Sequence, residues 1–232
     1  MKLSRASPVL DLIGNTPTLP LQFEPEGLTV YVKCEFLNPS GSIKDRFAAA
    51  VVTDAERRGL LRPDSIILEC TSGNTGIALS MIGAARGYRV TILMSEEASH
   101  ERRQLIRQFG AELILFKSEG RYQTGITLSR EMAAGDSRYF LPRQFENPLN
   151  ADDHELSTGQ EILRQVPGPI CRATRIAAVT FAPEEVPTNR PNWRLNRRAI
   201  ATASALVTLT SPSMGADPSK AGMKPSAIPS IR

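Results

Sequence analysis

Short apolar runs alternate with longer amphipathic segments from residue 29 to about residue 165, and this alternation limits the possible folds more than any other feature. The apolar runs predict strands at residues 29–35, 65–70, 88–94, 111–116 and 138–141. The amphipathic segments predict helices at residues 44–58, 75–86, 100–109, 124–134 and 152–166. Units of this length, in this order, form a largely parallel sheet with helices on both faces. The predicted fold class is therefore α/β.

The composition changes at Pro167. The 66 residues from there onward hold nine of the 17 prolines but only three of the 16 glycines, and the strand–helix alternation stops. Residues 199–209 could form one short element, but the proline-rich stretches around it predict disorder. We expect an incomplete folded region at residues 1–166 and an irregular tail at residues 167–232. The tail resembles an out-of-frame translation of a GC-rich gene, and a genuine tail is the alternative.

Charge is unevenly distributed along the chain. The formal net charge is +4, but residues 167–232 carry nine Lys/Arg and three Asp/Glu, a net of +6, so residues 1–166 carry a net of −2. The basic character therefore comes from the tail, whose arginines near Trp193 form no patterned basic face, and no nucleic-acid partner is expected. Neither a run of about 18 apolar residues nor the apolar core of a signal peptide is visible. We expect a cytoplasmic protein with no membrane partner.

Cysteine and histidine positions show no metal-binding pattern. Cys34, Cys70 and Cys171 have no paired spacing, and the first two lie in apolar runs, which predicts buried reduced thiols. His100 and His154 are the only histidines, and neither has a ligating side chain three or four residues later. We expect both histidines on the surfaces of helices and no metal site.

Lys44 lies in a distinctive local context. Residues 38–46 read Asn-Pro-Ser-Gly-Ser-Ile-Lys-Asp-Arg, so the lysine is in the first turn of a predicted helix, after a loop of small residues. The helix dipole at this position opposes a cation and lowers the amine pKa. A neutral amine is the form that attacks an aldehyde. The sequence thus makes Lys44 a candidate for imine chemistry, whereas a solvated surface lysine is the ordinary alternative.

A second small-residue loop follows the predicted strand at 65–70. Residues 71–76 read Thr-Ser-Gly-Asn-Thr-Gly and run directly into the next predicted helix. Glycines allow the backbone to approach a ligand, and the free N–H groups at the helix start suit a carboxylate or a phosphate. An ordinary strand-to-helix turn with a Ser or Thr cap remains the alternative.

Together the two loops supply an amine and a carboxylate cradle, which amino-acid chemistry on pyridoxal phosphate (PLP) requires. In this pairing, and over roughly residues 10–166, the chain resembles the cysteine synthase family, comprising the O-acetylserine sulfhydrylases and their cystathionine β-synthase relatives, of PLP fold type II. Besides these loops, the resemblance rests on Ile-Gly-Asn-Thr-Pro at 13–17, Glu-Arg-Arg at 101–103, Gly-Ala-Glu-Leu at 110–113, Gln-Phe-Glu-Asn-Pro at 144–148 and Thr-Gly-Gln-Glu-Ile at 158–162. It implies the fold type II N-terminal domain and part of the second domain.

The resemblance also implies roles for individual residues. Lys44 would hold PLP covalently and act as the general base at Cα, and Asn74 would donate a hydrogen bond to the cofactor ring oxygen. Four side chains would bind the substrate carboxylate: Thr71, Ser72, Thr75 and Gln144. The reaction would be β-replacement on O-acetylserine or a similar β-substituted alanine, with sulfide, giving L-cysteine. A homodimer is expected for the intact family, with serine acetyltransferase as a further partner.

The sequence departs from the family pattern after residue 162. The Gly-Thr-Gly-Gly-Thr type of loop, which binds the PLP phosphate in the family, is missing from the sequence, as is a later Ser or Thr region for the pyridine nitrogen. We therefore expect impaired activity. A non-catalytic remnant or binding module is one alternative, and other fold type II enzymes are another: cystathionine β-synthase or serine/threonine dehydratase. Thr75 argues against a dehydratase, because dehydratases of this fold usually place His after the corresponding Asn.

Overall fold

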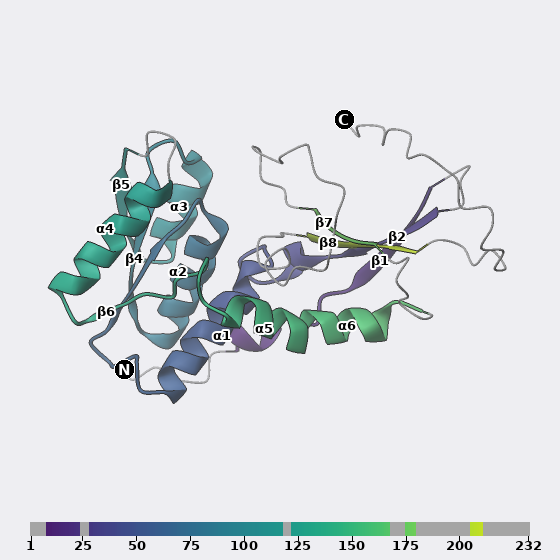
Figure 1. Cartoon of the computed structure of the whole chain (residues 1–232), viewed down its shortest axis with the longest axis horizontal. Helices are drawn as coiled ribbons and strands as arrows, with labels where there is room; N and C mark the ends of the chain where they lie inside the picture. The colour runs from purple at the N-terminus through teal and green to yellow at the C-terminus, as the bar shows by residue number, and fades with distance from the viewer. Residues whose placement is uncertain (1–7, 24–27, 118–121, 168–174, 180–204, 211–232) are drawn as a thin grey trace.

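Figure 1 shows the chain as a computed structural model, which describes residues 8–23, 28–117, 122–167, 175–179 and 205–210. A parallel sheet forms one part of the described chain. Its strands, in spatial order, are β5 (Glu112–Phe116), β4 (Arg89–Ser95), β3 (Ile66–Cys70) and β6 (Tyr139–Phe140). The central strand β3 is buried along its whole length, as its apolar sequence predicts.

Helices cover both faces of this sheet. On one face lie α1 (Lys44–Arg57), α2 (Asn74–Arg86) and α3 (His100–Gln108), which share a core with Ile67 and Ile92 of the strands. On the other face α4 (Tyr122–Gly135) packs on Leu68, Cys70 and Leu93. Alternate side chains of a strand point to opposite faces, so each face of β3 has its own core. The α/β fold class, with a parallel sheet between helices, is confirmed.

A second sheet is antiparallel and lies beside the parallel sheet and its helices in Figure 1. It contains β1 (Thr18–Phe23), β2 (Leu28–Lys33), β8 (Ala205–Thr210) and β7 (Arg175–Val179), in that spatial order. The strand predicted at residues 29–35 is therefore real but does not join the parallel sheet. It pairs with β1, a strand that the sequence did not predict because Pro20 interrupts its apolar pattern. Proline is tolerated there because β1 is an edge strand of this sheet.

The tail contributes two strands to this antiparallel sheet. β8 overlaps the short element expected within residues 199–209 and pairs with β2, while β7 is a strand that the sequence did not predict. The rest of the tail, residues 168–174, 180–204 and 211–232, lies outside the described residues. The division of the chain near residue 166 therefore stays a prediction.

The predicted helix at residues 152–166 is wrong in its bounds. Two helices occupy this stretch, α5 (Leu149–Leu156) and α6 (Thr158–Gln165), and they meet at Ser157, where φ is −113° and ψ is −75°. The Ser157 hydroxyl donates to the carbonyl oxygen of Asp153 at 2.7 Å, the type of contact that bends helices. Helix α6 contacts β2 and the segment before β1, because Glu161 accepts from Lys33 Nζ at 2.5 Å and from the N–H of Asn15 at 2.9 Å.

Two short 3₁₀ turns complete the described elements, η1 (Leu10–Leu12) and η2 (Glu35–Leu37). Across the described ranges, no helix combines the length and the apolar character needed to cross a membrane.

Candidate active site

Helices α1 and α2 pack side by side and begin at the same end of the sheet. Their C-terminal turns are joined, since Arg86 Nη1 lies 3.8 Å from Glu56 Oε2, and the Tyr88 hydroxyl donates to Glu56 Oε1 at 3.1 Å. Both helices contribute to one core. Their first residues, Lys44 and Asn74, are therefore at the same end of the helix pair. The two loops that the sequence singled out therefore lie at the same end of this helix pair.

The loop before α1 is held by its own side chains. The Asp45 carboxylate accepts a hydrogen bond from the backbone N–H of Ser40 at 2.7 Å and a second from the Ser40 hydroxyl. Asn38 accepts from the backbone N–H of Gly14 at 2.8 Å. Gly41 has a φ of 87°, a left-handed conformation that glycine adopts without strain. These contacts fix the first turn of α1, where Lys44 lies.

Lys44 itself is buried, with 7% of its surface exposed. Burial lowers the pKa of its amine from 10.5 to about 8, because the charged form loses hydration. The direction matches the sequence-based expectation, although burial rather than the helix dipole is the cause. An amine with this pKa is partly neutral near pH 8 and can act as a nucleophile or a base.

The loop at 71–76 forms a compact turn at the carboxyl end of β3. The Thr71 hydroxyl accepts from the N–H of Gly73 at 3.1 Å, and Gly73 has a φ of 155°. A Cβ atom on Gly73 would lie 2.3 Å from Cδ of Arg102, so a larger residue would have to displace the Arg102 side chain and would strain the backbone at this φ. Thr71 and Thr75 are buried, whereas Ser72 is exposed and Asn74 is half-buried at the start of α2. Such a helix start is favourable for an anion.

Gln144 meets this loop from a distant part of the chain. Its side-chain oxygen accepts from the Thr75 hydroxyl at 2.5 Å, and its side-chain nitrogen donates to the Cys70 carbonyl at 3.1 Å. The Gln144 carbonyl in turn accepts from the Asn150 amide at 2.9 Å. Two of the four residues assigned to the substrate carboxylate are therefore in direct contact, 69 positions apart in sequence.

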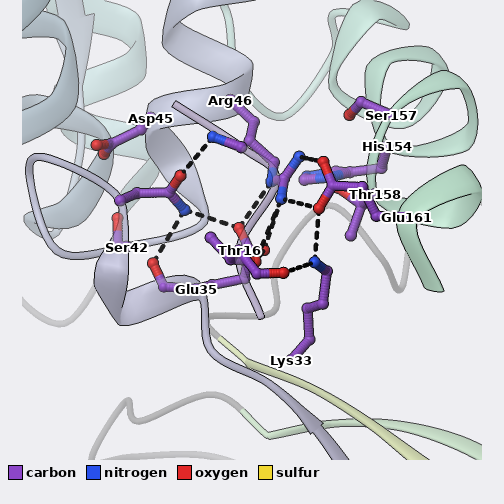
Figure 2. Close-up of polar contacts among 12 residues, drawn as sticks. Thr16, Lys33, Glu35, Ser42, Asp45, Arg46, His154, Ser157, Thr158 and Glu161 are labelled. Atoms are coloured by element: carbon purple, nitrogen blue, oxygen red, sulfur yellow. Dashed lines mark hydrogen bonds and ion pairs between the residues drawn. The ribbon is translucent and has the colours of Figure 1, made fainter. Parts of the chain in front are cut away.

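A buried ion cluster, formed by Lys33, Glu35, Arg46 and Glu161, lies beside this site (Figure 2). Arg46 donates from Nε and Nη2 to Glu35 at 2.7 and 2.8 Å, and from Nη1 and Nη2 to Glu161 at 2.7 and 2.8 Å. Lys33 Nζ lies 2.5 Å from Glu161 Oε2. Two cations and two carboxylates balance each other, and the exposed side-chain fraction is 7% or less for each.

The ion cluster ties α6 to the start of α1 and to β2. Burial raises the pKa of Glu161, but hydrogen bonds from Arg46 and Lys33 outweigh it and lower the pKa to about 2. Burial also raises the pKa of Glu35, but Arg46, together with hydrogen bonds from Thr16 and Asn38, outweighs it and lowers the pKa. The sequence did not predict the cluster, since these charges lie up to 128 positions apart. Only the Lys-Asp-Arg and Thr-Gly-Gln-Glu-Ile motifs hinted that these segments matter.

His154 corrects the expectation of a surface histidine. Its side chain, on α5, is 1% exposed, and its Nδ1 lies 2.9 Å from the Thr158 hydroxyl. Burial lowers its pKa to about 4, and the positive charges of Lys44 and Arg46 add to this effect. The helical pattern missed the burial because it could not show that α5 packs against α1. His100, in contrast, is exposed as expected.

The cysteines agree with the prediction where they are described. Cys34 and Cys70 are buried free thiols, and Cys171 lies outside the described residues. Within the part of the chain that the structure describes, no three His, Cys, Asp or Glu side chains gather in a way that could hold a metal ion.

Comparison with known proteins agrees with this geometry. Residues 9–180 match the family model described as pyridoxal-phosphate dependent enzyme. O-ureido-L-serine synthase of Streptomyces lavendulae is 48% identical over 161 residues, which cover 69% of this chain and 49% of that protein. A cysteine synthase of Staphylococcus aureus is 43% identical over 162 residues, covering 69% and 52%. The crystal structure of O-ureido-L-serine synthase superposes with a TM-score of 0.66 at 48% identity, over 69% of this chain and 51% of that one.

The chain belongs to the family of pyridoxal-phosphate dependent enzymes of the cysteine synthase type. The suspected resemblance is confirmed, and PLP is the cofactor of the family. The chain spans about half the length of the curated relatives it matches.

The described residues fit the reactive end of PLP. Lys44 offers a buried amine with a lowered pKa for the aldehyde, and the start of α2 offers donors nearby. Two buried polar atoms on α5, Asn150 Oδ1 and His154 Nε2, have no hydrogen-bond partner among the described residues. Buried polar atoms are nearly always paired, so these two are unusual among the described residues.

Proposed function

We propose that this chain comes from an enzyme of β-replacement, which exchanges the β-substituent of O-acetyl-L-serine or a similar β-substituted alanine for sulfide and forms L-cysteine. One observation carries the proposal most directly: the contact between Thr75 and Gln144, on the same end of the helix pair as the buried amine of Lys44. An amino-acid substrate needs a carboxylate site beside the reacting amine, and this arrangement offers one.

In this proposal PLP, when bound through Lys44, supplies electron withdrawal from the substrate Cα. Asn74 would donate a hydrogen bond to the cofactor ring oxygen. The substrate carboxylate is oriented by Thr71, Ser72, Thr75 and Gln144. Once the substrate amine has replaced Lys44 at the cofactor, the freed Lys44 amine would take the α-proton, acetate would leave Cβ with its bonding electrons, and the sulfur of hydrosulfide would form the new bond to Cβ. Lys44 then returns a proton to Cα, so the net change is acetate for thiol.

The relatives indicate more than one product for this type of site. O-ureido-L-serine, the product named for one relative, is itself a β-substituted alanine. The products of both relatives therefore carry the same amino-acid carboxylate, and different nucleophiles would give them at the same carboxylate site. A cystathionine β-synthase or a serine/threonine dehydratase would use the same amine. The alternative that is not an enzyme is a non-catalytic remnant or binding module that keeps only the carboxylate site. As in the family, we propose a cytoplasmic homodimer, with serine acetyltransferase as a candidate partner.

An assay of cysteine formation tests the proposal. We expect the chain, incubated with PLP, O-acetyl-L-serine and sulfide, to form L-cysteine slowly, because the sequence lacks the Gly-Thr-Gly-Gly-Thr loop of the family. Gln144→Ala is expected to lower the rate by a further factor of roughly ten to a hundred, by misplacing the carboxylate. The control is Gln123→Ala, an exposed position on α4. Consumption of O-acetyl-L-serine with hydroxyurea but not with sulfide would contradict the proposed product.

The lowered pKa of Lys44 predicts the pH dependence of cofactor capture. The neutral amine is the reactive form, and its pKa of about 8 lies below the ordinary 10.5. The rate of covalent capture of PLP should therefore rise between pH 7 and 9 with a midpoint near 8, and then level off. Stopped-flow absorbance measures it, with Nα-acetyl-lysine in free solution as the control. A rate that still rises steeply above pH 9 would contradict the burial argument.

A further inference from the structure

Glu69 is a buried carboxylate that the proposed mechanism does not use. It is the fourth residue of β3, between the apolar Leu68 and Cys70, and only 5% of its surface is exposed. Among the described residues no ion pair reaches it. An ionised carboxylate in such a place is costly unless hydrogen bonds satisfy it. The groups that donate hydrogen bonds to Glu69 therefore indicate which part of the structure its carboxylate stabilises.

Backbone N–H groups satisfy Glu69 from two segments. Its Oε2 accepts from the N–H of Gln144 at 3.2 Å, and its Oε1 accepts from the N–H of Cys70 at 3.1 Å. The N–H of Arg143 contributes a further hydrogen bond. Arg143 has a φ of 55°, an unusual conformation for a residue with a side chain, which the surrounding contacts must maintain. Glu69 thus holds the turn that presents Gln144.

We infer that Glu69 is a positioning residue for the carboxylate site: it fixes the backbone at Arg143 and Gln144, and through the Gln144 side chain it fixes Thr75 at the start of α2. The chain of contacts is continuous, from Glu69 to the Gln144 backbone and from Gln144 Oε1 to the Thr75 hydroxyl. The inference rests on the proposed function insofar as it assigns a carboxylate ligand to Thr75 and Gln144. It adds a residue that touches neither substrate nor cofactor.

The surroundings of Glu69 give this contact a pH dependence. Burial raises its pKa to about 7 despite the backbone donors, and the charge of Glu146 adds to the rise. Two other charged groups line the same small groove: Arg143, on the loop that Glu69 holds, and Arg130 on α4, which pairs with Glu146. Cys70, the next residue on β3, has a pKa raised to about 12 by burial. Protonation makes one carboxyl oxygen a poorer acceptor, so acidification from pH 8 to 6 loosens the turn.

The first arm of the test follows backbone amides in the ¹⁵N-labelled full chain by NMR between pH 5 and 9. The amide resonances of Cys70 and Gln144 should titrate together with a midpoint near 7 in the unmodified chain. They should not titrate in Glu69→Gln, and should titrate normally in Glu131→Gln, which removes an exposed carboxylate from α4. The unmodified chain decides this arm even where Glu69→Gln fails to fold. The absence of a shared transition near pH 7 would overturn the inference.

The second arm measures the affinity for propionate, a carboxylate without an amine. Its dissociation constant should rise about threefold to tenfold as the pH falls from 8 to 6, and Glu69→Gln should bind weakly at both values. Protonation of Lys44 would change affinity in the opposite direction, because a cation attracts the anion. Equal affinity of Glu69→Gln and the unmodified chain at pH 8 would overturn the inference. No propionate binding at any pH would instead refute the proposed carboxylate site, and the amide titration alone would then decide the role of Glu69.

Discussion

Replacing Arg46 with methionine is expected to lower the free energy of unfolding by about 3–5 kcal/mol. The arginine makes paired contacts to both Glu35 and Glu161, and all three side chains are buried. Methionine fills much of the volume but leaves two carboxylates without their main partner. An uncompensated buried charge costs far more than the ion pair contributes in the intact protein. Urea unfolding at pH 7, followed by circular dichroism, measures the change.

Arg57→Met on the same helix is the matched control. Arg57 pairs with Asp54 at 2.6 Å, but 78% of its side chain is exposed, and such surface pairs contribute about 0–1 kcal/mol. A loss at Arg46 no larger than the loss at Arg57 would show that the ion cluster does not anchor α6 to the start of α1.

Replacing Lys44 with alanine is expected to lower the rate of covalent PLP capture by the chain on the order of a hundredfold. Of the other lysines, the structure describes Lys33 and Lys117, and neither lies at the start of α1 beside the loop at 71–76. Lys33 is unsuited in particular, because its amine is committed to Glu161, Gln165 and the carbonyl of Thr16. Absorbance of the adduct, compared at equal protein concentration and pH 8, measures the loss.

Lys117→Ala serves as the control, since Lys117 is exposed at the end of β5. Capture should be unchanged in this variant. Equal rates for Lys44→Ala and the unmodified chain would remove the main support for the proposed site.

The elements of the parallel sheet could be predicted from sequence because their signals are local. Helix α1 was expected at 44–58 and spans Lys44–Arg57, and Gly87 ends α2 in a left-handed conformation as its position indicates. The break at Ser157 escaped prediction because a serine hydroxyl can bond to the preceding turn without changing the apolar period. β1 escaped because Pro20 is acceptable only at an edge, which the sequence does not reveal.

Local sequence signals mark only part of the candidate site, because its long-range contacts leave no local pattern. Lys44 and the loop at 71–76 lie at helix starts, and glycine, serine and threonine mark such places. Gln144 came only from the family resemblance, and its contact with Thr75 is a long-range feature. Glu69 appears in sequence as one polar residue within a buried strand, and Lys33 and Glu161 as ordinary charges. Their importance depends on burial and partners, which no local pattern records.

Reductive labelling tests the central claim most directly. The chain is incubated with PLP at pH 8, reduced with borohydride, digested, and the modified peptide is identified by mass spectrometry. The account predicts a single major label on Lys44, at the start of α1, with Gln144→Ala and the unmodified chain labelled at the same residue. A major label on Lys33 or Lys117 would contradict the assignment of Lys44 as the cofactor lysine.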